Sequence, residues 1–401
     1  MRSTVETHPF FNVSRVFHHI EELCYPRRVG TPGERRAARY ILREFAGLGL
    51  ERKRETFPVA LGPSEIGGRL VFALCVALVL LGVVLVPSRP AVAAACWGLA
   101  GALVNSPWRV AGPLGRWWPA RTTSQNLLAT LSGTTEEAPA RVIFMAHYDT
   151  KSQLLPTGVR VALVSMAVSL CGLLALLGLA AAVGSPGALA QVHFRALAGV
   201  VVLLLAGLIA NVTGNRSPGA LDNGSGVGTL LELARSWRPT DEAPVEVYWV
   251  ASGSEEVGSD GACAFLKTYE SWWRQKPTLL INLESVGAGA HLRLAGEERS
   301  VRLAGEVADR LGLPHSRFGV LGAGMDHEPF AARDLSALSI LGDVVRHSLV
   351  MHTPGDHMGL IQRPALLRAA LLAGHLAWAW AALHQPADAA TDPEAVGVGV
   401  A

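Results

Sequence analysis

The chain has 401 residues, of which 50% are hydrophobic and 17% are charged, and its formal net charge is +2. An intrinsically disordered protein needs low hydrophobicity and a high net charge, so this class is excluded. Five cysteines are too few for a disulfide scaffold, and without a Lys/Arg block the sequence predicts no nucleic-acid partner. The apolar excess therefore requires either a very large core or a membrane.

The first 65 residues are polar and contain no early apolar stretch, so we expect no secretory signal in them. Apolar side chains recur at helical spacing in residues 32–48 and predict a helix there. Thr31 is the expected N-cap, and Gly47 and Gly49 are the expected end of the helix.

Four uncharged apolar runs come next, in two pairs: residues 70–86, 91–104, 161–183 and 196–210. A membrane-spanning helix needs about 20 apolar residues, a length that the first and third runs approach or exceed. The second and fourth runs are shorter, and buried core helices are the alternative. A Pro/Gly-containing turn joins the members of each pair, and a segment that leaves a domain must return to it. We therefore predict two transmembrane helical hairpins, residues 66–105 and 155–214.

The Lys and Arg residues near these hairpins predict their orientation. Seven lie on the side of the remaining chain: Arg69, Arg109, Arg116, Arg121, Lys151, Arg160 and Arg216. Only Arg89 and Arg195 lie near the hairpin tips. By the positive-inside rule, this distribution predicts a multi-pass protein of the cell membrane with its polar domain in the cytoplasm.

The remaining residues, 1–65, 106–154 and 215–385, are predicted to form one α/β domain. Short apolar runs bounded by turn residues predict buried strands, and they alternate with helical patterns; the strands are expected at residues 125–131, 141–146, 245–251 and 279–283. This alternation predicts a mainly parallel sheet with helices on both faces. Residues 363–383 are expected to be a packed terminal helix, with a fifth span as the alternative. Residues 386–401 are expected to be a disordered tail.

Acidic residues and histidines follow several of these strands. The candidates are His147, Asp149, Asp222, Glu255, Glu256, Glu284 and His352. Taken singly, each has a structural alternative: an Asn-Gly turn, a solvated charged loop or a structural histidine. Together they contain the two imidazoles and several carboxylates that two divalent metals with a bridging carboxylate require. Mixed nitrogen and oxygen ligands favour zinc, although cobalt or manganese also fit.

Five motifs appear in a fixed order: H-x-D, D-N-x-S-G, S-E-E-x-G-S-x-G, N-L-E-S-x-G and H-T-P-x-D. This order resembles the di-zinc exopeptidases of metallopeptidase family 28. The family includes bacterial aminopeptidases, glutamate carboxypeptidases, glutaminyl cyclases and a membrane-bound peptidase of the endoplasmic reticulum. Further matches lie at residues 28–35 and 325–330, so the resemblance covers about residues 27–361. It implies the zinc exopeptidase fold, with a mixed, mainly parallel sheet.

The resemblance also implies roles for the candidate residues. His147, Asp222 and Glu284 correspond to the ligands of one metal. Asp222, Glu256 and His352 correspond to those of the other, so that Asp222 bridges two zinc ions. Glu255 resembles the general base, and Asp149 resembles the partner that holds the His147 ring. The family also implies a cis peptide between Asp222 and Asn223, whereas Asp326 and His327 match a loop near the site and receive no metal role.

The sequence departs from the family pattern in two places. Glu284 stands where many soluble members carry Asp, which is more similar to the reticulum branch. Asp222 follows His147 by 75 positions, where the family usually has a short connection. The extra length is the second apolar hairpin, which leaves and re-enters the domain at the metal site. The catalytic mouth is therefore expected near the membrane surface, with short apolar peptides as substrates.

The resemblance implies a zinc-dependent exopeptidase, with aminopeptidase activity preferred over carboxypeptidase activity, and the two apolar hairpins predict that it is membrane-bound. Its expected partners are a peptide substrate and the lipid bilayer, while the oligomeric state is left open. The alternatives are a glutaminyl-cyclase-like acyltransferase with a single zinc, a catalytically inactive binding protein and a membrane scaffold.

Overall fold

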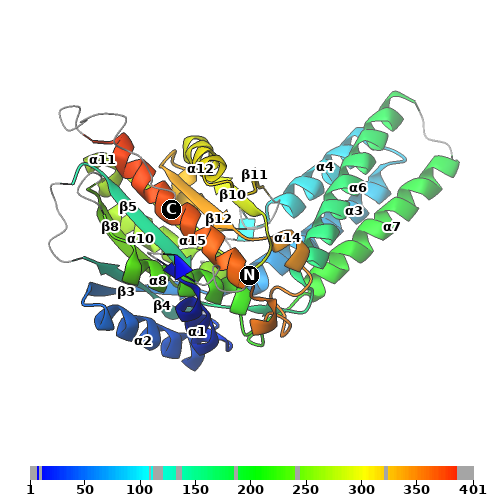
Figure 1. Ribbon diagram of the computed structural model, residues 1–401. Helices are drawn as coiled ribbons and strands as arrows, with labels where there is room; N and C mark the ends of the chain where they lie inside the picture. The colour runs from blue at the N-terminus through cyan, green and yellow to red at the C-terminus, as the bar shows by residue number, and fades with distance from the viewer. Residues whose placement is uncertain are drawn as a thin grey trace.

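The structure of the protein, a computed structural model, describes residues 7–8, 11–107, 110–111, 121–131, 138–184, 188–239, 244–319 and 324–385. A sheet domain and an elongated helical bundle make up the described chain, and the bundle projects from one side of the sheet domain (Figure 1). The predicted tail at 386–401, together with Arg109 and Arg116, lies outside the described residues.

The central sheet has eight strands in the order β11-β10-β12-β9-β5-β8-β4-β3. In that order they are His315–Arg317, Leu292–Gly296, Ala337–Leu341, Thr278–Glu284, Arg141–His147, Glu246–Ser252, Arg121–Thr130 and Glu51–Ala60. The four pairs β11–β10, β12–β9, β9–β5 and β5–β8 are parallel, and the other three are antiparallel. The mixed, mainly parallel sheet predicted from the sequence is confirmed. Two small antiparallel sheets pair β1 (Thr7–His8) with β2 (Phe11–Asn12) and β6 (Ser152–Gln153) with β7 (Thr213–Gly214).

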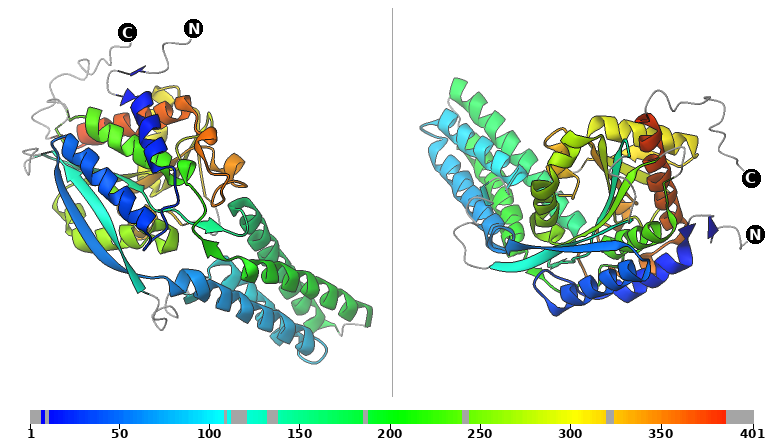
Figure 2. Two further views of the ribbon diagram at one scale, coloured as in Figure 1. Left: turned by 90° about the horizontal axis from the view of Figure 1, so that it is seen from below. Right: turned by 90° about the vertical axis from the view of Figure 1, so that its left-hand side faces the viewer.

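Helices cover both faces of the central sheet, as Figure 2 shows with the sheet seen on edge. One face carries α1 (Val13–Leu23), α2 (Pro32–Gly47), α8 (Ser225–Ser236), α12 (Glu298–Arg310) and α15 (Arg363–Leu383). The other carries α10 (Asp260–Tyr269), α11 (Ser271–Gln275) and α13 (Glu328–Ala331). Successive side chains of a strand point to opposite faces, so Phe144 packs into the first layer and Met145 into the second. This two-sided burial explains the continuous apolar runs of the central strands.

The predicted helix at 32–48 is α2. Its N-cap is Thr31, whose hydroxyl accepts a hydrogen bond from the Glu34 amide, and Pro32 occupies the first helical position. The predicted strands correspond to β4, β5, β8 and β9. The other four strands of the central sheet, β3, β10, β11 and β12, were not predicted. β3 is an edge strand of largely exposed, charged residues, paired only with β4 on one side.

The bundle consists of α3 (Gly68–Leu85), α4 (Pro90–Asn105), α6 (Thr157–Val183) and α7 (Ala188–Ala210). The four helices form a closed ring of contacts in the order α3, α4, α6, α7 (Figure 1). α7 is longer than the apolar run at 196–210 because it also includes Gln191, His193 and Arg195. These polar residues lie near the tip of the second hairpin.

Four described helices are long and apolar enough to cross a membrane: Glu65–Leu85, Thr157–Val183, Gln191–Ala210 and Arg363–Leu383. α4 is a shorter apolar helix. α15 meets the same criterion, but Leu366, Leu372 and Leu376 lie fully buried in the core of the sheet domain. This placement is that of the packed terminal helix expected from the sequence.

Close packing around one tryptophan joins the helices of the bundle. Trp97 of α4 is fully buried, donates a hydrogen bond from Nε1 to the Val79 carbonyl (3.1 Å), and stacks on Phe194 at 5.3 Å between ring centroids. The indole fits because Gly82 and Gly178, which face it, have no side chain. Small residues at helix contacts are typical of membrane bundles.

Candidate metal centre

The candidate residues converge at the carboxyl edge of the central sheet. His147 and Glu284 are the last residues of β5 and β9, which are adjacent parallel strands. Glu255 and Glu256 begin the short helix α9 (Glu255–Gly258), which follows β8. Asp222 lies in η2 (Ala220–Gly224), before α8, and His352 lies in the turns after α14 (Val344–His347). Segments far apart in the sequence thus bring their side chains to one edge, where ligands bind in such sheets.

The first group of potential ligands is His147, Asp222 and Glu284. Nε2 of His147 lies 3.2 Å from Oδ1 of Asp222 and 3.2 Å from Oε1 of Glu284. All three residues are buried. The three atoms therefore face one point from three different segments.

The second group is Asp222, Glu256 and His352. Nε2 of His352 lies 3.0 Å from Oδ2 of Asp222 and 3.1 Å from Oε2 of Glu256. Asp222 thus offers one carboxylate oxygen to each group. In the same place, Lys151 Nζ lies 2.8 Å from Oε2 of Glu256.

Asp222 is held by the chain around it. The buried carboxylate of Asp356 accepts hydrogen bonds from the amides of Leu221 (2.6 Å) and Asp222 (3.1 Å). The Asn223 side chain donates to the Leu283 carbonyl, which ties this segment to the strand that carries Glu284. The Asp222–Asn223 peptide is cis, as the resemblance implied.

The rings of both histidines are oriented through Nδ1. In His147 this atom lies 3.2 Å from the main-chain carbonyl oxygen of Asp149 and 3.6 Å from its carboxylate. The Asp149 carboxylate instead accepts hydrogen bonds from the amides of Glu255 (3.1 Å) and Glu256 (3.2 Å). Asp149 therefore contacts both the His147 ring and the start of α9, which is more than the single contact with His147 that the sequence suggested.

In His352, Nδ1 lies 2.9 Å from the hydroxyl oxygen of Thr157. Thr157 is the first residue of α6, so the second helical hairpin contacts the centre directly. Sequence reasoning missed Thr157 and Lys151. Both residues follow the H-x-D motif closely in the sequence. The sequence signal for Thr157 is Pro156, which precedes it at the start of a helix.

The electrostatics divide the carboxylates into two kinds. Burial raises the pKa of Asp222, but its hydrogen bonds with His147 and His352 outweigh burial and bring the pKa far below its usual range. Burial also raises the pKa of Glu256, yet His352 and Lys151 lower it to about 2. Both carboxylates are therefore ionised at neutral pH.

Glu255 behaves in the opposite way. Its Oε2 lies 3.9 Å from Nε2 of His147, with no closer ion pair among the described residues. Burial raises the pKa of Glu255 well above the usual value. The charge of His147 lowers this pKa, whereas the charges of Glu256 and Glu284 raise it further. Burial likewise raises the pKa of Glu284, so these two carboxylates differ from Asp222 and Glu256.

The donor set fits divalent zinc. Each group combines imidazole nitrogen with carboxylate oxygens and contains no thiolate. Bonds of about 2.0–2.2 Å to a tetrahedral zinc place neighbouring donors roughly 3.4 Å apart, close to the 3.0–3.2 Å found here. The shared Asp222 is suited to hold two such ions side by side.

The nearby motif at 325–330 faces the centre without joining it. One oxygen of the buried Asp326 carboxylate accepts a hydrogen bond from the Ser252 hydroxyl at 2.5 Å. Nδ1 of His327 lies 2.7 Å from the Ser339 hydroxyl. Neither residue belongs to the two groups of potential ligands among the described residues.

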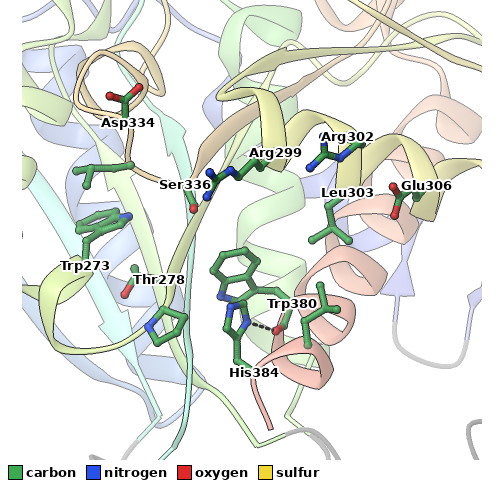
Figure 3. Close-up of a pocket in the computed structure, with 13 residues that line it drawn as sticks. Trp273, Thr278, Arg299, Arg302, Leu303, Glu306, Asp334, Ser336, Trp380 and His384 are labelled. Atoms are coloured by element: carbon green, nitrogen blue, oxygen red, sulfur yellow. Dashed lines mark hydrogen bonds between the residues drawn. The ribbon is translucent and has the colours of Figure 1, made fainter. Parts of the chain in front are cut away.

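A cavity of about 690 Å³ lies at the opposite edge of the sheet, next to the first residue of β9 and the residue before β12 (Figure 3). Its walls include Trp273, Arg299, Trp380 and His384. It contains none of the candidate ligands and is separate from the metal centre.

A mixed sheet with helices on both faces is the architecture of zinc aminopeptidases, and comparison with known proteins agrees. The sequence model of "Peptidase family M28" matches residues 126–377, more than half of the chain, and the chain belongs to this family. It is 29% identical over 166 residues to aminopeptidase YwaD of Bacillus subtilis (strain 168). That match covers 38% of this chain and only 36% of the relative.

Two solved structures illustrate the fold. A zinc aminopeptidase from Bacillus subtilis superimposes with a TM-score of 0.54 and 15% identity, covering 93% of this chain and 96% of the other. Glutaminyl cyclase from Fimbriiglobus ruber gives a TM-score of 0.54 and 16% identity, with 94% and 96% covered. At these identities the likeness shows the fold alone.

Proposed function

We propose that the protein is a membrane-bound, zinc-dependent exopeptidase, with aminopeptidase activity preferred. The observation that carries this proposal is the pair of ligand groups joined by Asp222, with the Glu255 carboxylate beside them. Membership of peptidase family M28 and the similarity to aminopeptidase YwaD support hydrolysis of peptide bonds.

His147, Asp222 and Glu284 would hold one zinc ion, and Asp222, Glu256 and His352 the other. When bound, the two ions supply an activated water and polarise the scissile carbonyl. Cobalt or manganese also suits these ligands.

Glu255 is the general base of the proposed reaction. Its carboxylate adjoins the first ligand group and takes the proton of the attacking water. It then returns this proton to the leaving nitrogen. Burial raises the pKa of Glu255, which makes its carboxylate a stronger base than a solvated glutamate. Asp149 keeps Glu255 in place through the hydrogen bond to its amide.

Two inserted hairpins, residues 66–105 and 155–214, would anchor this domain in the lipid bilayer. The apolar outer surfaces of α3, α6 and α7 support this, since large aliphatic side chains such as Leu80, Leu176 and Leu203 are exposed there. The Lys and Arg distribution supports a cytoplasmic catalytic domain. The remaining residues, 1–65, 106–154 and 215–385, would form the peptidase domain.

A digest of a synthetic peptide library by the purified protein tests the proposal. Read by mass spectrometry, the zinc-loaded protein should release single residues from one end, N-terminal residues first. A chelator should abolish the release, and added zinc should restore it. Cleavage that is unaffected by the chelator, or no cleavage at all, would contradict the proposal.

The glutaminyl-cyclase-like alternative rests on the shared fold. It requires a single zinc, and the same library would then contain cyclised N-terminal glutamine in place of shortened peptides. The completeness of both ligand groups, which share Asp222, favours the peptidase, because a single zinc requires only one of them.

A further inference from the structure

The first turn of α6 is fixed against the metal centre. The Thr157 hydroxyl lies 2.9 Å from Nδ1 of His352, and the Gly158 amide donates a hydrogen bond to the Ser348 carbonyl at 2.8 Å. Just before the helix, the Leu155 amide donates to the Asn211 side chain at 2.9 Å. The start of this helix therefore has a defined position relative to the centre and is part of its wall.

Arg160 lies three residues after Thr157, and residues at this spacing share one face of a helix. Its side chain is partly buried, and the charges that act on it are those of Glu256 and Glu255. Yet no residue that the structure describes forms an ion pair or hydrogen bond with its guanidinium group. Lys151, the other cation of this region, is already paired with Glu256 at 2.8 Å.

A partly buried cation without a direct partner loses some of its contact with water, so such a group is suited to receive an anion. The guanidinium group presents parallel N–H donors that match a carboxylate in a bidentate way. Thr157, one turn earlier on the same face of α6, contacts His352, and the charges of Glu256 and Glu255 act on Arg160, so this donor lies on the side of the helix that faces the centre. One residue of extended chain spans only about 3.3–3.6 Å, so the carboxylate that Arg160 can reach belongs to a very short peptide.

We propose that Arg160 binds the C-terminal carboxylate of the substrate, so that the protein prefers dipeptides and similarly short peptides with a free carboxylate. This proposal rests on the proposed exopeptidase function and names its substrate class. It also gives the second hairpin a role in specificity in addition to that of an anchor.

The test compares one dipeptide, Ala-Leu, with its C-terminal amide, using the zinc-loaded full chain in lipid nanodiscs. The wild type should show a kcat/KM ratio of about 10–100 in favour of the free acid, as expected for a charge-assisted hydrogen bond. Arg160→Met should reduce this ratio to about one, and Arg160→Lys should retain part of it. The exposed Arg89, near the far end of the bundle, supplies the control: Arg89→Met should leave the ratio unchanged.

Binding to the Glu255→Gln variant gives a second readout that requires no turnover. Calorimetry should show Ala-Leu binding more tightly than its amide, and adding Arg160→Met should remove that difference. Equal kcat/KM and equal binding of acid and amide by the wild type would overturn the proposal, as would an equal loss on both substrates in Arg160→Met. If the wild type hydrolyses neither substrate but still binds the acid preferentially, the exopeptidase function fails while the Arg160 site stands.

Discussion

The hydroxyl of Thr157 lies 2.9 Å from Nδ1 of His352, so the first residue of an apolar bundle helix supports a candidate metal ligand. Because Nε2 of His352 faces Asp222 and Glu256, Nδ1 is the nitrogen left to carry the proton and donate it to this hydroxyl. The bundle and the centre are therefore parts of one structure.

Removal of the Thr157 hydroxyl should weaken zinc binding. Partners of metal-bound histidines typically contribute 10–100-fold to metal affinity, so Thr157→Val should weaken the second zinc site by about that factor, whereas Thr157→Ser should bind as the wild type does. Competition with a chromophoric chelator measures this. Thr268→Val, at an exposed position on α10, is the control, and equal affinity of Thr157→Val and the control would disprove the role of Thr157.

Asp356 should matter for stability as well as for the centre. Its carboxylate accepts the amides of Leu221 and Asp222, and an asparagine offers only one oxygen for these two donors. One buried amide is left without an acceptor, which costs about 1–3 kcal/mol. Asp356→Asn should therefore lower the free energy of unfolding and the zinc affinity together. The exposed Asp309 provides the comparison, since Asp309→Asn should change neither; unchanged stability of Asp356→Asn would contradict the prediction.

The packing of the bundle predicts different effects for two glycine substitutions. A Cβ at Gly82 would lie 2.3 Å from Nε1 of Trp97, whereas one at Gly172 would meet nothing within 4 Å. Gly82→Ala should destabilise the bundle by about 1–3 kcal/mol through overpacking, while Gly172→Ala should be neutral or slightly stabilising. Thermal unfolding in nanodiscs compares the two, and equal melting temperatures would contradict the packing around Trp97.

Glu34 predicts a pH dependence of stability away from the centre. Burial raises its pKa from 4.5 to about 7, although hydrogen bonds from Ser124 and the Gly30 amide oppose this. The folded state thus favours the protonated carboxyl of Glu34. The contribution of this group to the free energy of unfolding is complete below pH 4.5 and is lost as the pH rises through 7. The loss amounts to at most about 3 kcal/mol.

Glu34→Gln removes this titration, so its melting temperature relative to the wild type should rise between pH 5 and pH 8. Glu51→Gln, at an exposed position of β3, serves as the control and should show no such trend. A difference between Glu34→Gln and the wild type that stays constant over this range would disprove the prediction.

The sequence predicts β5 and β9 because their burial on both faces leaves a short apolar run, although β12, which is equally buried, was not predicted. It does not predict β3, whose Glu51 and Arg52 read as a polar loop until pairing with β4 satisfies the backbone. Edge strands depend on a neighbour that only the folded chain supplies.

The candidate ligands could be chosen because each stands in a short sequence motif, at a strand end for His147 and Glu284 and in a turn or helix start for the others. Thr157 could not, because its partner His352 lies 195 positions away and the contact exists only after the second hairpin has folded against the domain. The same holds for Arg160. In the sequence it is one of several basic residues beside an apolar run, and only the placement of α6 brings it within range of the charges of Glu256 and Glu255.

The central claim is that Asp222 joins two cation sites, and the zinc content of the purified protein tests it most directly. Elemental analysis should find two zinc ions per chain in the wild type, about one in His352→Ala and fewer than one in Asp222→Ala. A single zinc in the wild type that persists in His352→Ala, or an Asp222→Ala variant with its full zinc content, would contradict the account.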